Sequence, residues 1–213
     1  MTAAGRFLTL EGIEGVGKTT QVARLAQELA GRGVAHVVTR EPGGTPLAES
    51  IRDIVLHPQG EALPATAELL LMFAARAVHL GNLIEPHLRA GRWVLCDRFT
   101  DATYAYQGGG RRMRVDDIRR LESMVQGTRR PDLTLWLDVP VAEALQRARQ
   151  RNAGAAADRF ESERVEFFER VREVYRARAA AEPDRIAVID SSRPADEVAA
   201  RILELLKARS WIS

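Results

Sequence analysis

The chain of 213 residues contains a single cysteine, Cys96, so it cannot form an internal disulfide bond. A lone cysteine is typical of a protein that works in a reducing compartment, and we expect a cytoplasmic location. The sequence also lacks an uninterrupted apolar run near the roughly 20 residues that cross a membrane, and its first residues lack the apolar stretch of a signal peptide. We therefore expect no membrane association.

Neither sign of charge dominates, because 31 lysine and arginine residues are balanced by 29 aspartate and glutamate residues. A nucleic-acid-binding surface needs basic residues gathered on one face, and here arginines gather only locally, so we expect no nucleic-acid partner. The four histidines show no metal-ligand spacing with Cys96, which argues against a structural zinc site. The hydrophobic content of 46% suits one globular domain over residues 1–213.

Short apolar segments alternate with stretches of helical periodicity along the chain. We expect strands at residues 6–11, 34–39, 93–97, 133–138 and 186–190. We expect helices at residues 18–31, 47–56, 64–90, 115–125, 141–151, 161–181 and 198–206. Gly81 and Pro86 are candidate breaks in the third helix, and residues 104–112 should end in a glycine-rich bend. This alternation predicts an α/β fold with a five-stranded parallel sheet flanked by helices.

The segment G-I-E-G-V-G-K-T-T begins at Gly12, directly after the first predicted strand. Its first eight residues match G-x-x-x-x-G-K-[ST], a loop whose backbone N–H groups surround phosphates. In this pattern Lys18 reaches the outer phosphates and Thr19 contacts Mg²⁺. We therefore predict that a nucleoside triphosphate is bound by Gly12, Ile13, Glu14, Gly15, Val16, Gly17, Lys18, Thr19 and Thr20.

An acid and an arginine follow the third predicted strand. Asp97, at the carboxyl end of a buried strand beside the P-loop, is a candidate for Mg²⁺ binding, directly or through water. Arg98 is a candidate phosphate clamp, because its planar guanidinium binds two oxygens at once. Taken alone, Asp97 could cap a helix and Arg98 could form a surface ion pair. Next to a P-loop we interpret both as functional.

Arginines at Arg147, Arg149, Arg151 and Arg159 flank the small-residue segment N-A-G-A-A-A-D. Such a run could be a solvated helix face. It could also be a lid, at approximately residues 147–160, that brings an arginine to the transferring phosphoryl group. We favour the lid, because the P-loop itself has no arginine and phosphoryl transfer gains greatly from one.

Two further patterns point toward an acceptor. Glu14 stands beside the predicted phosphates, so it is either solvated or in contact with a sugar hydroxyl or an arginine near the acceptor. Phe73 and Arg76 are one helical turn apart, a spacing that lets an aromatic ring stack on a base while an arginine bonds its edge. A core phenylalanine with a surface arginine would show the same spacing.

Together these motifs resemble bacterial thymidylate kinase (dTMP kinase), and they follow its order over nearly the whole chain. The matching blocks are G-I-E-G-V-G-K-T-T at Gly12, T-R-E-P-G-G-T at Thr39, L-L-L-M-F-A-A-R at Leu69, C-D-R-F at Cys96, A-T-Y-A-Y-Q-G-G-G-R at Ala102, P-D-L-T-L-W-L-D at Pro131 and D-R-F-E at Asp158. The resemblance implies a P-loop nucleoside monophosphate kinase fold with a lid segment. It also implies ATP-dependent phosphorylation of dTMP to dTDP, with Mg²⁺, in dTTP biosynthesis.

The resemblance also assigns the acceptor site. Arg98 would bind the dTMP phosphate, Phe73 would stack near the thymine and Arg76 would bond it. Many members place the stacking phenylalanine one position earlier, where this chain has Met72. Tyr106 would help to exclude a ribose 2′-OH. The implied dTMP-binding set is Glu14, Arg40, Pro42 (where the family often has a cis peptide), Phe73, Arg76, Arg98, Thr103, Tyr106 and Gln107.

The family divides by whether its catalytic arginine lies in the P-loop or in the lid, and this chain resembles the lid-arginine type. The implied catalytic residues are Lys18, Arg98, Arg151 and Arg159. Members are usually homodimers joined through long helices, and the apolar segment 64–90 could supply the interface.

Two other functions share part of this pattern. A deoxynucleoside kinase, or another nucleotide kinase of the same fold, would have the same P-loop. A deoxynucleoside kinase would lack a strong phosphate clamp at Arg98, because its acceptor carries no phosphate. A GTP-binding switch would need an N-K-x-D segment for guanine, and the sequence has none.

Overall fold

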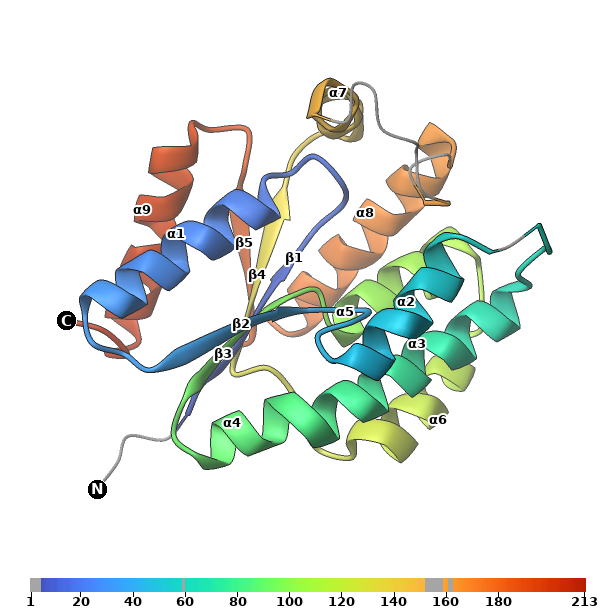
Figure 1. Ribbon diagram of the computed structural model, residues 1–213. Helices are drawn as coiled ribbons and strands as arrows, with labels where there is room; N and C mark the ends of the chain where they lie inside the picture. Colours follow the sequence, from blue (N-terminus) through green and yellow to red (C-terminus); the bar gives the residue numbers. More distant parts are fainter. Residues whose placement is uncertain (1–4, 59, 152–158, 161–162) are drawn as a thin grey trace.

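A five-stranded parallel sheet forms the centre of the molecule, with strand order β2–β3–β1–β4–β5 (Figure 1). The computed structural model describes residues 5–58, 60–151, 159–160 and 163–213. The strands are β1 (Phe7–Glu11), β2 (His36–Arg40), β3 (Trp93–Asp97), β4 (Leu133–Asp138) and β5 (Ile186–Asp190). The predicted fold class and all five predicted strands are confirmed. Every residue of β1 is buried, as expected for a central strand with helices on both faces.

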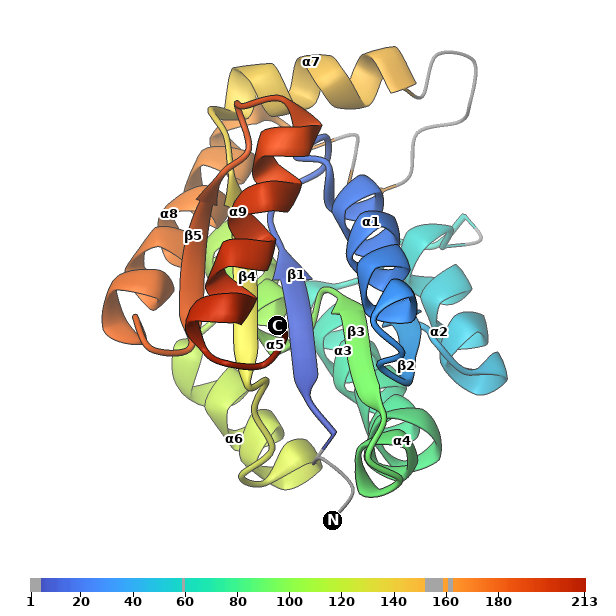
Figure 2. The ribbon, with the colours of Figure 1, turned by 90° about the vertical axis from the view of Figure 1, so that its left-hand side faces the viewer.

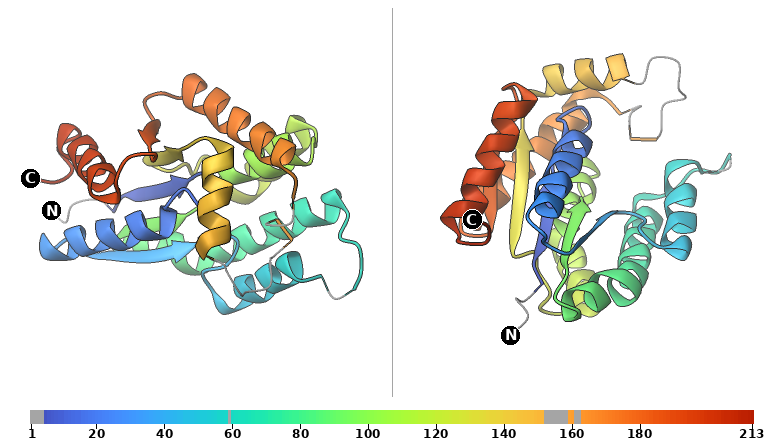
Figure 3. Two further views of the ribbon diagram at one scale, coloured as in Figure 1. Left: turned by 90° about the horizontal axis from the view of Figure 1, so that it is seen from above. Right: turned by 60° about the vertical axis from the view of Figure 1, so that its left-hand side comes forward.

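Helices cover both faces of this sheet. α1 (Lys18–Gly31) and α9 (Ala195–Ala208) pack on one face, as Figures 1 and 2 show. The other face carries α3 (Ala65–His79), η1 (Leu80–Ile84), α4 (Glu85–Arg89), α5 (Thr100–Thr103), η2 (Tyr104–Gly110), α6 (Val115–Gln126) and α8 (Val165–Ala181), with α2 (Pro46–Leu56) packed outside α3. α7 (Val141–Arg151) lies across the carboxyl ends of the strands (Figure 3). Of the predicted helix 161–181, residues 161 and 162 lie outside the described residues.

The helical stretch that follows α2 is continuous from Ala65 to Arg89, so Gly81 and Pro86 do not break it. Its middle turn, Leu80–Ile84, widens to a π-helix just before Pro86, a residue that has no N–H to donate to the preceding turn. By length and composition this helix could cross a membrane, but much of it is buried inside the fold. Core helices of soluble proteins pass the same test, so it is only weak support for a membrane span.

The expected glycine-rich bend at residues 104–112 is instead helical through Gly110. The glycines are needed for close packing against α8. A Cβ on Gly110 would lie 2.4 Å from the ring of Phe167, and one on Gly109 would lie 2.7 Å from Val174 and 2.9 Å from the Arg170 carbonyl oxygen. Glycine in this segment therefore permits close helix packing and does not mark a turn.

A layer of buried polar side chains lies beneath the P-loop. Glu11, the last residue of β1, accepts hydrogen bonds of 2.7 Å from the Phe99 N–H and from the Tyr175 hydroxyl. Asp101 accepts from Arg178 at 2.6 Å and from Arg185 at 2.7 Å. These bonds tie β1, α5 and α8 together directly below the loop that follows Glu11.

Burial raises the pKa of Glu11 from its usual 4.5 to about 8, and the nearby negative charge of Asp101 acts in the same direction. The folded protein therefore holds a proton that the unfolded chain releases between these two values. The contribution of Glu11 to the free energy of unfolding is fully present below pH 4.5 and is lost as the pH rises through about 8.

Replacing Glu11 with glutamine should therefore flatten the alkaline side of the stability profile. Glutamine keeps an oxygen for the Phe99 N–H and carries no titrating proton. Between about pH 6 and pH 9, the wild-type Tm should fall by roughly 5 °C more than the Tm of Glu11→Gln. Thermal unfolding followed by circular dichroism checks this, and parallel Tm profiles for the two proteins would contradict it.

Candidate active site

The P-loop joins β1 to α1 and is fixed from two sides. Lys18 is buried, and its Nζ donates to the carbonyl oxygens of Gly12 and Ile13, both at 3.0 Å. Burial lowers the pKa of Lys18, with the positive charge of Arg98 adding to this effect. On the other side, Gly15 has a φ of +81°, and a Cβ there would lie 1.9 Å from the carbonyl oxygen of Ala144 in α7. Only glycine fits this contact.

A wide cavity opens beside the loop; we call it the P-loop cavity. Its empty volume is about 1300 Å³. Six of its lining side chains are cationic and three are acidic, so it favours an anionic ligand. It is lined by Glu14, Gly15, Gly17, Lys18, Thr19, Thr20, Arg40, Glu41, Arg52, Asp97, Arg98, Arg147 and Arg151. The side chains of Ile13 and Val16 are buried in the core, so these two loop residues offer a ligand only their backbone.

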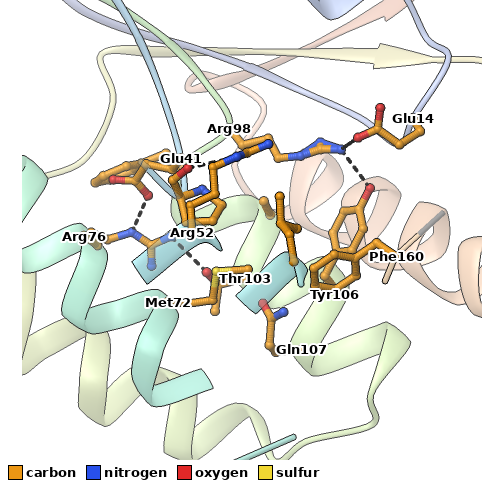
Figure 4. A pocket seen from close by; sticks show the side chains of 14 residues that line it. Glu14, Glu41, Arg52, Met72, Arg76, Arg98, Thr103, Tyr106, Gln107 and Phe160 are labelled. Atoms are coloured by element: carbon orange, nitrogen blue, oxygen red, sulfur yellow. Dashed lines mark hydrogen bonds and ion pairs between the residues drawn. The ribbon is translucent and has the colours of Figure 1, made fainter. Parts of the chain in front are cut away.

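A second cavity, of about 590 Å³ empty volume, lies deeper between α2, α3, α5 and η2; we call it the inner cavity (Figure 4). It is lined by Glu14, Glu41, Pro42, Arg52, Leu56, Met72, Arg76, Arg98, Phe99, Ala102, Thr103, Tyr106, Gln107 and Phe160. Its apolar side chains and few polar groups suit a flat organic ring with hydrogen-bonding edges. The predicted residues Pro42, Arg76, Thr103, Tyr106 and Gln107 are all in this wall, and the predicted cis peptide precedes Pro42.

Arg98 stands where the two cavities meet and lines both of them. Its guanidinium donates to the Gly12 carbonyl oxygen at 3.0 Å, to Glu14 at 2.6 Å and to the Tyr106 hydroxyl at 3.1 Å (Figure 4). Its backbone has a φ of +69°, a conformation that non-glycine residues rarely adopt. This left-handed turn directly after β3 places a fixed cation between the P-loop and the inner cavity.

Glu14 lies opposite Arg98 and also lines both cavities. Burial alone would raise the pKa of Glu14, but the positive charges of Lys18, Arg98 and Arg151 hold it well below its usual range. The sequence left two interpretations of Glu14, a solvated side chain or a contact with an arginine. The structure shows the contact, with Arg98 as the donor. The carboxylate of Glu14 therefore offsets part of the positive charge of these three side chains.

Arg76 is buried at the far end of the inner cavity. Its guanidinium donates to Glu41 at 2.7 Å and to the Thr103 hydroxyl at 3.0 Å, while Nη1 has no partner among the described residues (Figure 4). Glu41 is held in turn by His79, 3.0 Å away. A buried N–H without a partner is unfavourable, so a ligand acceptor that reached this atom would gain a hydrogen bond.

Phe73, predicted to stack on a base, is not among the residues that line the inner cavity. It is 2% exposed and packs with Leu69, Tyr104 and Ile118. Met72, its neighbour in sequence, lies in the cavity wall instead. Successive residues of a helix point about 100° apart, so only one of the two can face the cavity.

Arg40, also predicted to bind dTMP, lies on the P-loop side of the site. Its side chain is exposed, pairs with Glu49 at 2.9 Å and lines the P-loop cavity, outside the wall of the inner cavity.

Asp97 and Thr19, the predicted metal ligands, both line the P-loop cavity. The Oδ1 atom of Asp97 is buried and has no hydrogen-bond partner in the described part of the chain. A carboxylate that lines a cationic cavity and keeps one oxygen free of described protein donors suits a hard cation shared with phosphates. Among described residues there is no cluster of three or more histidine, cysteine, aspartate or glutamate side chains that could hold a metal unaided.

The two candidate catalytic arginines lie in different places. Arg151, at the end of α7, lines the P-loop cavity and approaches Glu14 at 3.4 Å. Arg159 donates to buried Glu68 and to the carbonyl oxygen of Leu63, at 2.9 Å for the latter. Between them, residues 152–158 of the predicted lid lie outside the described residues.

The sequence matches the family model for thymidylate kinase over residues 10–202. It is 56% identical over 210 residues to the thymidylate kinase of Chromohalobacter salexigens, covering 97% of this chain and 98% of that protein. It is 52% identical over 204 residues to the thymidylate kinase of Teredinibacter turnerae, covering 96% of this chain and 98% of that protein. The chain belongs to the thymidylate kinase family. A crystal structure of thymidylate kinase from Ehrlichia chaffeensis matches with a TM-score of 0.76 at 32% identity, over 95% of this chain and 99% of that one.

Membership of the thymidylate kinase family confirms the resemblance inferred from the motifs, the P-loop nucleoside monophosphate kinase fold and the class of phosphotransferase. Several residues of the inner cavity have no individual assignment from the sequence, among them Glu41, Arg52 and Phe160. Glu41 had a signal, because it lies inside the block T-R-E-P-G-G-T. Phe160 lies inside D-R-F-E. Arg52 had no such sequence signal, because a single arginine on an amphipathic helix is usually a surface residue.

The different positions of Arg151 and Arg159 predict different effects on a thymidylate kinase. Arg151→Ala should lower kcat by on the order of 10³, because its guanidinium lies in the P-loop cavity where phosphoryl transfer would occur. Arg159→Ala should keep kcat within about tenfold of the wild-type value and should mainly raise KM for the acceptor. Arg159 bonds to Glu68 outside the P-loop cavity, so its loss should affect acceptor binding more than phosphoryl transfer. Steady-state kinetics check this, with Arg176→Ala on exposed α8 surface as a control. Equal losses of kcat in both variants would contradict the assignment.

Proposed function

We propose that this chain transfers the terminal phosphoryl group of ATP to the phosphate of dTMP, giving ADP and dTDP, and so acts in nucleotide biosynthesis. The observation that carries the proposal is the meeting of two cavities at Arg98. One is cationic and bordered by the P-loop, and the other has groups suited to the edge of a pyrimidine. Two substrates bound in them would have their phosphates adjacent.

The donor side consists of the P-loop and the start of α1. The ammonium of Lys18, which now donates to two loop carbonyl oxygens, would turn to the outer phosphates of ATP. The backbone N–H groups of the loop and the N-terminus of α1 would face the same phosphates. Thr20 and the neighbouring loop residues complete the wall of this cavity.

The acceptor side is the inner cavity. The Nη1 atom of Arg76 would donate to a carbonyl oxygen of thymine, and Thr103 and Gln107 would line the nucleoside. Tyr106, held against Arg98 by a 3.1 Å hydrogen bond, would stand near the sugar and limit the space for a 2′-OH. Met72 would pack against the base from α3.

Thr19 and Asp97 are the residues that would hold Mg²⁺, together with oxygens of the phosphates. When bound, this ion neutralises part of the charge on the phosphates of ATP. The partnerless, buried Oδ1 of Asp97 supports the assignment.

Phosphoryl transfer itself is served by fixed cations. An oxygen of the dTMP phosphate, oriented by Arg98, would attack the terminal phosphorus of ATP as the bond to ADP breaks. Lys18 and Arg151 would stabilise the negative charge on the transferring group, as preorganised cations do in such sites. We therefore propose that the chain is of the lid-arginine type, with a lid at approximately residues 147–160.

We further propose a single kinase domain over residues 1–213, a cytoplasmic location and a homodimer. Exposed apolar side chains at Leu70 of α3 and at Leu47 and Ile54 of α2 support a second copy packed against this side of the helical layer.

A panel of acceptors tests the reaction. ADP release, coupled to a colorimetric readout with ATP and Mg²⁺, should be rapid with dTMP and at least about a hundredfold slower with thymidine, because Arg98 needs a phosphate to bind. Turnover of thymidine without turnover of dTMP would instead support a deoxynucleoside kinase. GTP binding without turnover of any acceptor would support a nucleotide-dependent switch.

A further inference from the structure

We propose that Glu68 is a positioning residue for pyrimidine recognition. Its carboxylate fixes the amide of Gln107 so that Oε1 faces the inner cavity, and it holds the aromatic wall of the same cavity in place. The inference rests on the proposed function, since it concerns how the acceptor base is recognised.

Glu68 is a fully buried carboxylate in the first turn of α3, 0% exposed. Three side chains from distant parts of the chain donate to it. Gln107 Nε2 donates at 2.7 Å, Arg111 Nε at 3.2 Å, and Arg159 Nη1 donates to the second oxygen. Arg111 is also paired with Glu163, so two carboxylates and two guanidiniums balance one another in this cluster. A buried carboxylate with this many donors is rigidly placed.

The contact with Glu68 determines which end of the Gln107 amide faces the cavity. A carboxylate only accepts hydrogen bonds, so the amide must present its NH₂ group to Glu68. A rotated amide would set oxygen against oxygen. The Oε1 atom of Gln107 therefore points away from Glu68; it is buried and has no partner among described residues, and Gln107 lines the inner cavity.

Two residues that line the inner cavity then carry buried atoms of complementary character that have no partner among the described residues. Gln107 Oε1 is an acceptor, and Arg76 Nη1 is a donor. A pyrimidine with an imide edge, as in thymine or uracil, presents an N–H beside a carbonyl oxygen and can satisfy both. Cytosine presents an acceptor nitrogen and an amino group at the same positions, so both contacts would be mismatched. Hydrogen-bonding sites of this kind discriminate strongly, because a wrong partner leaves buried polar groups unpaired.

The other partners of Glu68 place the aromatic wall of the cavity. The guanidinium of Arg111 lies 5.4 Å from the ring centroid of Phe160 and 5.0 Å from that of Phe167. Phe160 lines the inner cavity and packs edge-on against Tyr106, with ring centroids 5.6 Å apart. Arg159, adjacent to Phe160 in sequence, is anchored to the same carboxylate. One buried group thus supports both the polar contact and the aromatic wall.

The test compares wild type and Glu68→Gln with dTMP and dCMP as acceptors. Glutamine keeps the shape of glutamate, but its NH₂ group can donate to Gln107 Oε1, so the amide of Gln107 loses its fixed orientation. We expect KM for dTMP to rise by on the order of tenfold and the dTMP-to-dCMP ratio of kcat/KM to fall by on the order of tenfold, with KM for ATP within about twofold. Should Glu68→Gln not fold, Glu68→Asp, which withdraws the carboxylate by one methylene, gives the same comparison.

Two further variants separate positioning from general stability. Glu122→Gln alters another buried carboxylate, bonded to Tyr104 and outside both cavities, and should leave the acceptor ratio unchanged. In a Gln107→Ala background, Glu68→Gln should no longer change the ratio, because the amide through which it acts is gone. The inference is overturned if Glu68→Gln leaves the dTMP-to-dCMP ratio of kcat/KM unchanged. It is also overturned if Glu68→Gln lowers that ratio equally in the wild-type and the Gln107→Ala backgrounds. Wild-type turnover of dTMP tests the proposed function separately.

Discussion

The ion pair between Arg98 and Glu14 is the contact on which the rest of the site depends. Arg98 joins the P-loop, through the Gly12 carbonyl oxygen, to the inner cavity, through the Tyr106 hydroxyl. Both residues of the pair line both cavities. A guanidinium fixed in this way needs little rearrangement to bind the phosphate of an acceptor, which is how preorganised charge promotes transfer. The carboxylate of Glu14 stabilises that cation until an anion arrives.

The fold brings this pair together through the register of its central strands. Leu10 of β1 pairs with Asp97 of β3, so the P-loop and Arg98 leave the sheet side by side. Beneath them, Glu11 bonds to the backbone of Phe99 and to Tyr175 of α8. The strained backbone of Arg98 is thus held by bonds on the residues next to it. Such strain persists only where the surrounding structure determines it, and it is typical of functional sites.

Patterns that depend on neighbouring residues were predictable from the sequence, and those that depend on packing were not. The five strands and the P-loop follow from local apolar runs and glycine positions. The choice between Met72 and Phe73 required knowing which side of α3 faces the cavity, a matter of tertiary packing. Arg159 looked equivalent to Arg151 because both flank one segment, yet its partner Glu68 is 91 residues away. Gln107 belonged to a recognised block, but only the contact with Glu68 defines the orientation of its amide.

Equilibrium binding of dTMP and of thymidine to wild type and to Arg98→Ala, by calorimetry without ATP, tests the central claim most directly. The two ligands differ only in the phosphate, so the ratio of their affinities reports the contact that Arg98 makes. Wild type should bind dTMP at least about tenfold more tightly than thymidine, since a charge-assisted contact is lost with thymidine. Arg98→Ala should bind the two with nearly equal affinity. A preference for dTMP that is undiminished in Arg98→Ala would contradict the account.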